Sequence, residues 1–94
     1  MPSRLSEEEI LRKLRAYPDW EYDDKSLVRS FEFDEYSEGL DLLNEIAEIA
    51  EVANHHPEMV LAWCRLDVSF RTHSAKGVTE HDFELLSRID DIVD

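Results

Sequence analysis

The sequence lacks the material from which several classes of protein are built. Its single cysteine, Cys64, cannot form an internal disulfide, and no Cys/His spacing typical of zinc sites occurs. It has only two glycines and no low-complexity stretch, which argues against disorder. No run approaches the roughly 20 apolar residues of a membrane helix, and the N-terminus lacks a signal-peptide core. We therefore expect one globular domain, residues 1–94, located in the cytoplasm.

Basic residues are also scarce. Ten Lys and Arg stand against 23 Asp and Glu, which gives a net charge of −13. Because phosphate contacts need clustered Lys and Arg, this balance argues against direct binding to nucleic acid or to an anionic membrane. Only three of the basic residues are lysines. Excess carboxylate with few lysines suggests adaptation to high salt, where screening shortens charge repulsion to ~3 Å at 1 M. An ordinary acidic protein is the alternative.

Capping signals and hydrophobic periodicity predict seven elements. Ser6 and Glu9 form a capping-box pattern before the first helix, and Ser37 is the expected N-cap of a long second helix. Alternating apolar and polar residues predict strands. A second capping-box pattern, Thr79 to Asp82, opens the last helix. The predicted segments are a helix over 7–16, strands over 20–22 and 27–33, a helix to about residue 53, strands over 59–64 and 66–71, and a helix reaching residue 93.

Paired strands separated by a helix favour an α+β fold. We expect a four-stranded antiparallel sheet with helices packed on one face, in the element order α-β-β-α-β-β-α. The order of strands within the sheet stays open. The second helix carries a broad apolar surface, of which core burial accounts for most and a subunit contact for the rest. Its stripe is formed by Leu40, Leu43, Ala47 and Ala50, widened by Ile46, Ile49 and Val52.

Three of the four histidines lie at informative spacings in the C-terminal half. His55 and His56 are adjacent and followed by Pro57, His73 comes later, and Asp82 follows. Imidazole is the one side chain with an ordinary pKa near neutrality, ~6.5, so it can both give and take a proton. Several imidazoles with a carboxylate nearby are typical of a site for general acid–base catalysis.

The pattern Glu51-Val52-Ala53-Asn54-His55-His56-Pro57, followed by Trp63, His73 and Asp82, resembles the signature of the pterin-4a-carbinolamine dehydratase family. The resemblance extends over roughly residues 5–93 and includes Trp20 and Phe31-Glu32-Phe33. It implies a hairpin turn at Cys64-Arg65. It also implies a lyase that dehydrates 4a-hydroxytetrahydrobiopterin to quinonoid dihydropterin and water, in tetrahydrobiopterin recycling, without a cofactor.

The resemblance implies roles for individual residues. His55 and His73 would form the proton-transfer pair, and His56 would orient the substrate. Glu51, one helical turn before His55, is expected either to hydrogen-bond that imidazole or to stay solvated. Asp82 is expected to orient or cap rather than to catalyse. Pro57 is expected to help orient the substrate, and Trp20 to be either a pterin contact or a core residue. Trp63 is expected to be buried in the sheet. His81 stands where an arginine is familiar in the family.

Other functions remain open. Three histidines can build a zinc site, but adjacent ligands diverge and no H-x-x-x-H or H-x-H pair is present, so no metal is expected. The expected partners are a small pterin substrate and copies of the chain itself, as a homodimer or homotetramer. The alternatives are a non-catalytic dimerisation module, as the family provides for a homeodomain transcription factor, or a protein of another pterin pathway such as molybdopterin metabolism.

Overall fold

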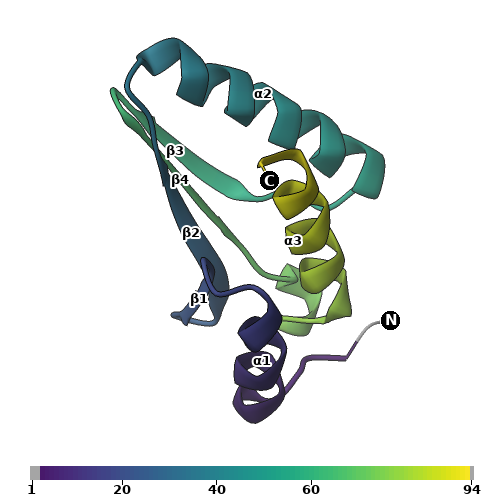
Figure 1. Ribbon diagram of the computed structural model, residues 1–94. Helices are drawn as coiled ribbons and strands as arrows, with labels where there is room; N and C mark the ends of the chain where they lie inside the picture. Colours follow the sequence, from purple (N-terminus) through teal and green to yellow (C-terminus); the bar gives the residue numbers. More distant parts are fainter. Residues whose placement is uncertain (1–2, 94) are drawn as a thin grey trace.

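The computed structural model describes residues 3–93 and confirms the predicted fold class and order of elements (Figure 1). The capping box at the first helix is present, with the Ser6 hydroxyl and the Glu9 carboxylate each accepting the other residue's backbone N–H. The elements are α1 (Glu7–Lys13) with a 3₁₀ turn (Leu14–Ala16), β1 (Glu21–Asp23), β2 (Ser26–Glu32), α2 (Tyr36–Ala53), β3 (Glu58–Ala62), β4 (Arg65–Phe70), a 3₁₀ turn (His73–Ala75) and α3 (Glu80–Val93).

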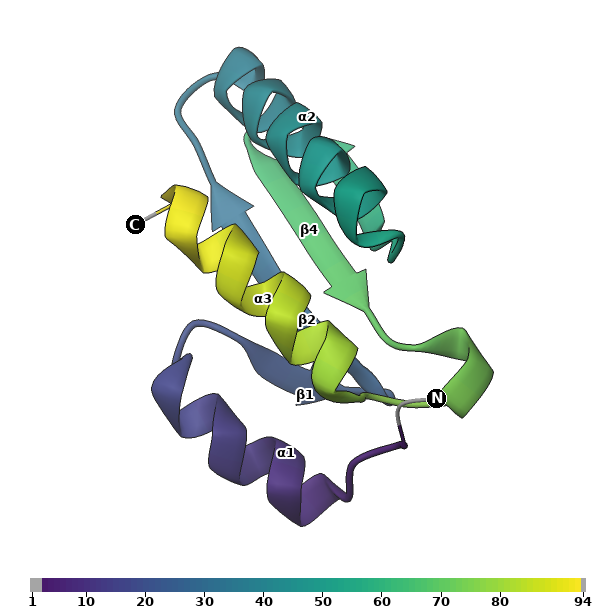
Figure 2. The same ribbon diagram turned by 90° about the vertical axis from the view of Figure 1, so that its right-hand side faces the viewer.

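The four strands form one antiparallel sheet in the order β1-β2-β4-β3. The pairing Leu27↔Phe70 joins β2 to β4, and Met59↔Val68 joins β3 to β4. The three helices lie on one face of this sheet (Figures 1 and 2). Strand β4 is one of the two inner strands, and the chain that follows it leads into the turn that contains His73.

The face of the sheet beneath the helices carries the core. Leu27, Phe31 and Leu66 are buried on this face, because side chains at alternate positions of a strand point the same way. The opposite face is polar: Ser30 and Asp67 are partners across β2 and β4, and the Ser30 hydroxyl donates to the Asp67 carboxylate at 2.6 Å. The alternation predicted for the second strand thus separates a buried face from a polar one.

Helix α2 corrects two expectations from the sequence. It begins at Tyr36, with Glu35 rather than Ser37 at the N-cap position. Its buried residues are Gly39, Leu42, Ile46 and Ala50, whereas Leu40 is 40% exposed. At Gly39 a Cβ atom would lie only 2.9 Å from the Leu61 side chain and 3.3 Å from that of Phe33. The close approach of the helix backbone at this glycine fixes which side of α2 faces the sheet.

The β3–β4 hairpin differs from the sequence prediction by one residue. Ala62 pairs with Arg65, so the two turn residues are Trp63 and Cys64, not Cys64 and Arg65. The register is the one that places Leu61 and Leu66 opposite each other against the core. Trp63 consequently lies at the turn, where it is 77% exposed, and the expectation that it is buried in the sheet is wrong.

Candidate active site

His55 reaches the site because helix α2 ends in a left-handed residue. Asn54 has φ 51° and ψ 42°, and its N–H donates to the carbonyl groups of Ala50 and Glu51. The next N–H, that of His55, donates back to the Ala50 carbonyl at 3.1 Å. Such a C-cap closes the last helical turn and redirects the chain. The His55 side chain is thereby turned from the helix end toward the start of α3.

His73 is positioned by a tight loop at the end of β4. Thr72 forms a bridge with Gly77, and its N–H donates to the Gly77 carbonyl at 2.9 Å. The residues between them form the 3₁₀ turn, which ends in Lys76 with φ 59°. The Thr72 side chain is buried while His73 is exposed. The loop therefore presents a hydroxyl inward and an imidazole outward.

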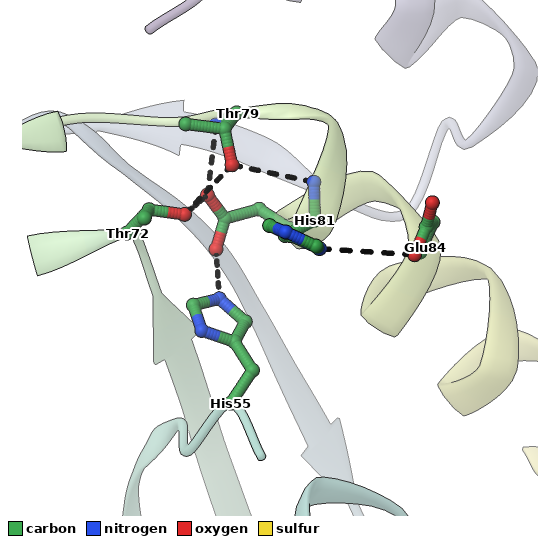
Figure 3. Close-up of polar contacts among 6 residues, drawn as sticks. His55, Thr72, Thr79, His81 and Glu84 are labelled. Atoms are coloured by element: carbon green, nitrogen blue, oxygen red, sulfur yellow. Dashed lines mark hydrogen bonds and ion pairs between the residues drawn. The ribbon is translucent and has the colours of Figure 1, made fainter. Parts of the chain in front are cut away.

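Asp82 lies in the first turn of α3, and its side chain is 0% exposed. One carboxylate oxygen, Oδ1, contacts His55 Nε2. The other, Oδ2, accepts from the Thr72 hydroxyl and from the Thr79 N–H, both at 2.8 Å (Figure 3). The buried carboxylate is therefore held by contacts from three different segments: the end of α2, the loop after β4 and the start of α3.

A cleft of about 620 Å³ opens beside this group. Its lining includes all four histidines of the chain, together with Asn54, Thr72 and Ser74. A smaller adjoining cleft of about 280 Å³ shares His56 and His73 with it and is otherwise lined by residues from all four strands and the loops beside them, most of them polar. The predicted histidines, from the ends of two different elements, therefore face one space.

The structure places the remaining predicted residues as follows. Glu51 contacts His56, at 3.1 Å from Nε2, and its side chain is exposed; of the two alternatives expected for it, the hydrogen bond to His55 is therefore wrong. Pro57 precedes β3 and does not line either cleft. Trp20 is 3% exposed, packs on Phe70 with 5.3 Å between ring centroids, and lines neither cleft. Trp20 is therefore a core residue in this structure.

Thr72 and Thr79 are the polar residues of the site whose contacts the sequence did not predict. The capping box expected at α3 is half formed, because the Asp82 carboxylate accepts from the Thr79 N–H. The Thr79 hydroxyl, however, accepts from the His81 N–H at 3.2 Å and contacts the Thr72 hydroxyl at 2.7 Å. The capping pattern was a signal for Thr79, and alternation along β4 was a signal that Thr72 points inward.

Residues 3–93 contain neither a candidate metal site nor a candidate membrane-spanning helix. No group of three or more His, Cys, Asp or Glu side chains there is arranged to hold a metal ion. No helix in that range combines the length and the apolar character needed to cross a bilayer.

Comparison with known proteins gives consistent matches. The family model described as pterin 4 alpha carbinolamine dehydratase matches residues 3–92. Relatives from Christiangramia forsetii (43% identical, over all of this chain and 97% of the relative) and Haloarcula marismortui (40%, over all of both chains) carry the provisional name pterin-4-alpha-carbinolamine dehydratase.

Two solved structures are also similar. A crystal structure from Brucella melitensis, described as a transcriptional coactivator/pterin dehydratase, matches with a TM-score of 0.89 and 37% identity, over 96% of this chain and 98% of the other. A pterin dehydratase-like protein described as a RuBisCO assembly factor matches with a TM-score of 0.66 at 18% identity, over 78% of this chain and 87% of the other. The second match shows the fold alone.

Proposed function

The chain belongs to the pterin-4a-carbinolamine dehydratase family, as its sequence resemblance indicated, and on that premise we propose that it dehydrates 4a-hydroxytetrahydropterins. The observation that carries the proposal is the convergence of His55, His56 and His73 on one cleft, with His55 bound to the buried Asp82. A family name alone would not support catalysis, because one fold can serve several functions.

The proposed reaction requires two proton transfers and no other group. In a 4a-carbinolamine the hydroxyl is on a ring carbon next to a ring N–H. One imidazole removes the proton from that nitrogen, the C–O bond breaks as a C=N bond forms, and the other imidazole protonates the departing hydroxyl, which leaves as water. Positioned general acids and bases typically contribute ~10²- to 10⁴-fold to such a rate. We assign these transfers to His55 and His73.

His56 has a different environment and a different proposed role. It is exposed and is joined to the exposed Glu51 across one turn at the end of α2. It also lines both clefts. We assign His56 and Glu51 to orienting the pterin at the mouth of the site. Tetrahydrobiopterin as the natural substrate, its recycling as the pathway and a cytoplasmic location stay predictions.

A non-catalytic interaction module is the second candidate, and one observation favours it. Helix α2 exposes Tyr36 (48%), Leu40 (40%) and Val52 (81%). Tyr36 and Leu40 lie one helical turn apart on the same side of α2, whereas Val52 lies on another side. A contiguous apolar surface of the Tyr36 and Leu40 kind is a feature of sites that bind a partner or a second copy. A homodimer or homotetramer through α2 would use these residues, and it is compatible with catalysis.

The two candidates are separated by a His73→Ala variant. The assay follows by absorbance the dehydration of a freshly generated 4a-hydroxytetrahydropterin, with and without protein. We expect the variant to keep its assembly state by size-exclusion chromatography and to lose most of the acceleration. The matched control is Arg88→Ala, which removes an exposed cationic side chain of α3 that lines none of the histidine clefts. An interaction module would show no acceleration from the wild type.

A further inference from the structure

The hydrogen bonds around Asp82 can be given directions by counting protons. The Thr72 hydroxyl has one proton, and it donates that proton to Asp82 Oδ2 at 2.8 Å. The 2.7 Å contact between the two threonine hydroxyls must therefore use the proton of Thr79. Thr79 Oγ1 in turn accepts from the His81 N–H at 3.2 Å. The chain of donors thus runs from the start of α3 through both threonines to the carboxylate (Figure 3).

This directed chain determines which oxygen of Asp82 faces His55. Oδ2 already receives the Thr72 hydroxyl and the Thr79 N–H. Oδ1 faces His55 Nε2, and an ionised carboxylate can only accept. The proton between them therefore belongs to Nε2, whether the imidazole is neutral or charged.

The other ring nitrogen of His55, Nδ1, is available for proton transfer. Among the residues that the structure describes, no hydrogen bond uses His55 Nδ1. In that same part of the chain, no buried side-chain nitrogen or oxygen lacks a partner, so Nδ1 is open to solvent. His55 lines the cleft and its side chain is 17% exposed. A neutral His55 thus offers an unprotonated Nδ1 to a molecule in the cleft.

We propose that Thr72 and Thr79 are positioning residues that act through Asp82, keeping a proton on His55 Nε2 and reserving Nδ1 for proton exchange with the substrate. The identity of the substrate rests on the proposed function; the proton arrangement does not. Both side chains are buried, Thr79 with 0% and Thr72 with 8% of its surface exposed, so their hydroxyls are directed into the protein toward Asp82. Without the Thr72 hydroxyl, Oδ2 would lose its side-chain donor, and without the Thr79 hydroxyl, the Thr72 hydroxyl would lose the contact that orients it. In either case the carboxylate would be held less firmly toward His55.

The first test reads the proton positions directly. In ¹⁵N-labelled protein, long-range ¹H–¹⁵N correlations above neutral pH distinguish a protonated from an unprotonated ring nitrogen. We expect the wild type to show His55 protonated on Nε2 alone. In Asp82→Asn, the Thr72 hydroxyl and the Thr79 N–H still need an acceptor, so the amide oxygen takes the place of Oδ2. The amide NH₂ group then faces His55 Nε2 as a donor. The ring proton of a neutral His55 should therefore move from Nε2 to Nδ1. A wild-type proton on Nδ1, or no inversion in Asp82→Asn, would overturn the inference.

The second test compares matched substitutions of the threonines. Thr72→Val and Thr79→Val remove a hydroxyl at nearly constant shape, while Thr72→Ser and Thr79→Ser retain it. We expect kcat of each Val variant to fall roughly 10- to 100-fold, the loss typical when a residue that orients a reacting ligand is removed. KM should change little, and each Ser variant should recover most of kcat. Folded Val variants with wild-type kcat, or Ser variants as impaired as Val, would contradict the positioning role.

The two tests separate this inference from the proposed function. If the wild type dehydrates no pterin, the proposed function fails, and the tautomer experiment still decides whether the threonines and Asp82 fix the proton of His55. If the wild type is active but His55 does not invert in Asp82→Asn, only the inference fails. A Val variant that does not fold leaves the decision to the other threonine and to Asp82→Asn.

Discussion

Replacing Asp90 by alanine should destabilise the fold strongly, because one carboxylate oxygen accepts hydrogen bonds from two donors that are wholly or largely shielded from water. Asp90 Oδ1 accepts from Trp20 Nε1 at 2.8 Å and from Arg29 Nη1 at 2.9 Å. The side chains of Arg29 and Asp90 are only 15% and 16% exposed. The guanidinium lies 4.3 Å from the centroid of the Phe31 ring, so it cannot easily turn to water. The alanine variant therefore leaves a part-buried guanidinium and a buried indole N–H without this acceptor.

The expected loss follows from these contacts. Removing one partner of a fully buried ion pair costs about 3–5 kcal/mol. Arg29 keeps a second carboxylate, Asp19, at 3.6 Å, so we expect about 2–3 kcal/mol here. In a domain of this size that corresponds to a fall in Tm of about 8–24 °C. Urea unfolding followed by circular dichroism measures the free energy.

Asp19→Ala is the matched control, since Asp19 contacts the same arginine but its side chain is 69% exposed. That variant should lose less than about 1 kcal/mol, as exposed ion pairs do. A double-mutant cycle with Trp20→Phe should give a coupling of about 1–2 kcal/mol between Trp20 and Asp90. Equal losses for Asp90→Ala and Asp19→Ala would refute the reasoning that burial makes the Asp90 contacts the stronger ones, and no coupling would refute the hydrogen bond between Trp20 and Asp90.

Three further predictions concern stability. The Ser6 N–H, which donates to the Glu9 carboxylate at 3.2 Å, holds the pKa of Glu9 below its ordinary value of 4.5. The ionised Glu9 carboxylate therefore stabilises the fold above pH 4.5, and this contribution is lost as the pH falls through the lowered pKa. The Glu9→Gln variant should therefore have a lower Tm than the wild type near neutral pH and the same Tm in strong acid. The Ile46→Ala variant, at a 0% exposed position of α2, should lose about 2–5 kcal/mol of unfolding free energy. Leu40→Ala, at a position 40% exposed, should lose less than about 1 kcal/mol. Similar losses for both variants in urea unfolding would contradict the orientation of α2. With a net charge of −13, the protein should gain thermal stability in molar KCl, and a Tm that stays flat or falls would remove support from adaptation to high salt.

Features set by neighbouring residues could be predicted from the sequence. The capping box of Ser6 and Glu9 spans three residues, and both of its hydrogen bonds are present. The alternation in β2 and the order of the seven elements were predictable for the same reason. The family resemblance supplied the histidines as a group.

Features set by contacts distant in the sequence could not. Apolar residues occur on two sides of α2, and the close approach of Gly39 to Leu61, not the periodicity, selects the buried side. The sequence offered Glu51 as a hydrogen-bond partner for His55, because Glu51 lies one helical turn before His55. The actual partner, Asp82, lies 27 residues away and reaches His55 only because α2 and α3 meet over the end of β4.

The measurement that tests the central claim most directly is the dehydration of a freshly generated 4a-hydroxytetrahydropterin, followed by absorbance at low salt and in molar KCl. It compares the wild type with a His55→Ala/His73→Ala variant whose fold is verified by circular dichroism. We predict acceleration by the wild type and its loss in the variant, by up to the ~10²- to 10⁴-fold that general acid–base catalysis contributes. Folded wild type that gives no acceleration at either salt, or a double variant as fast as the wild type, would contradict the account.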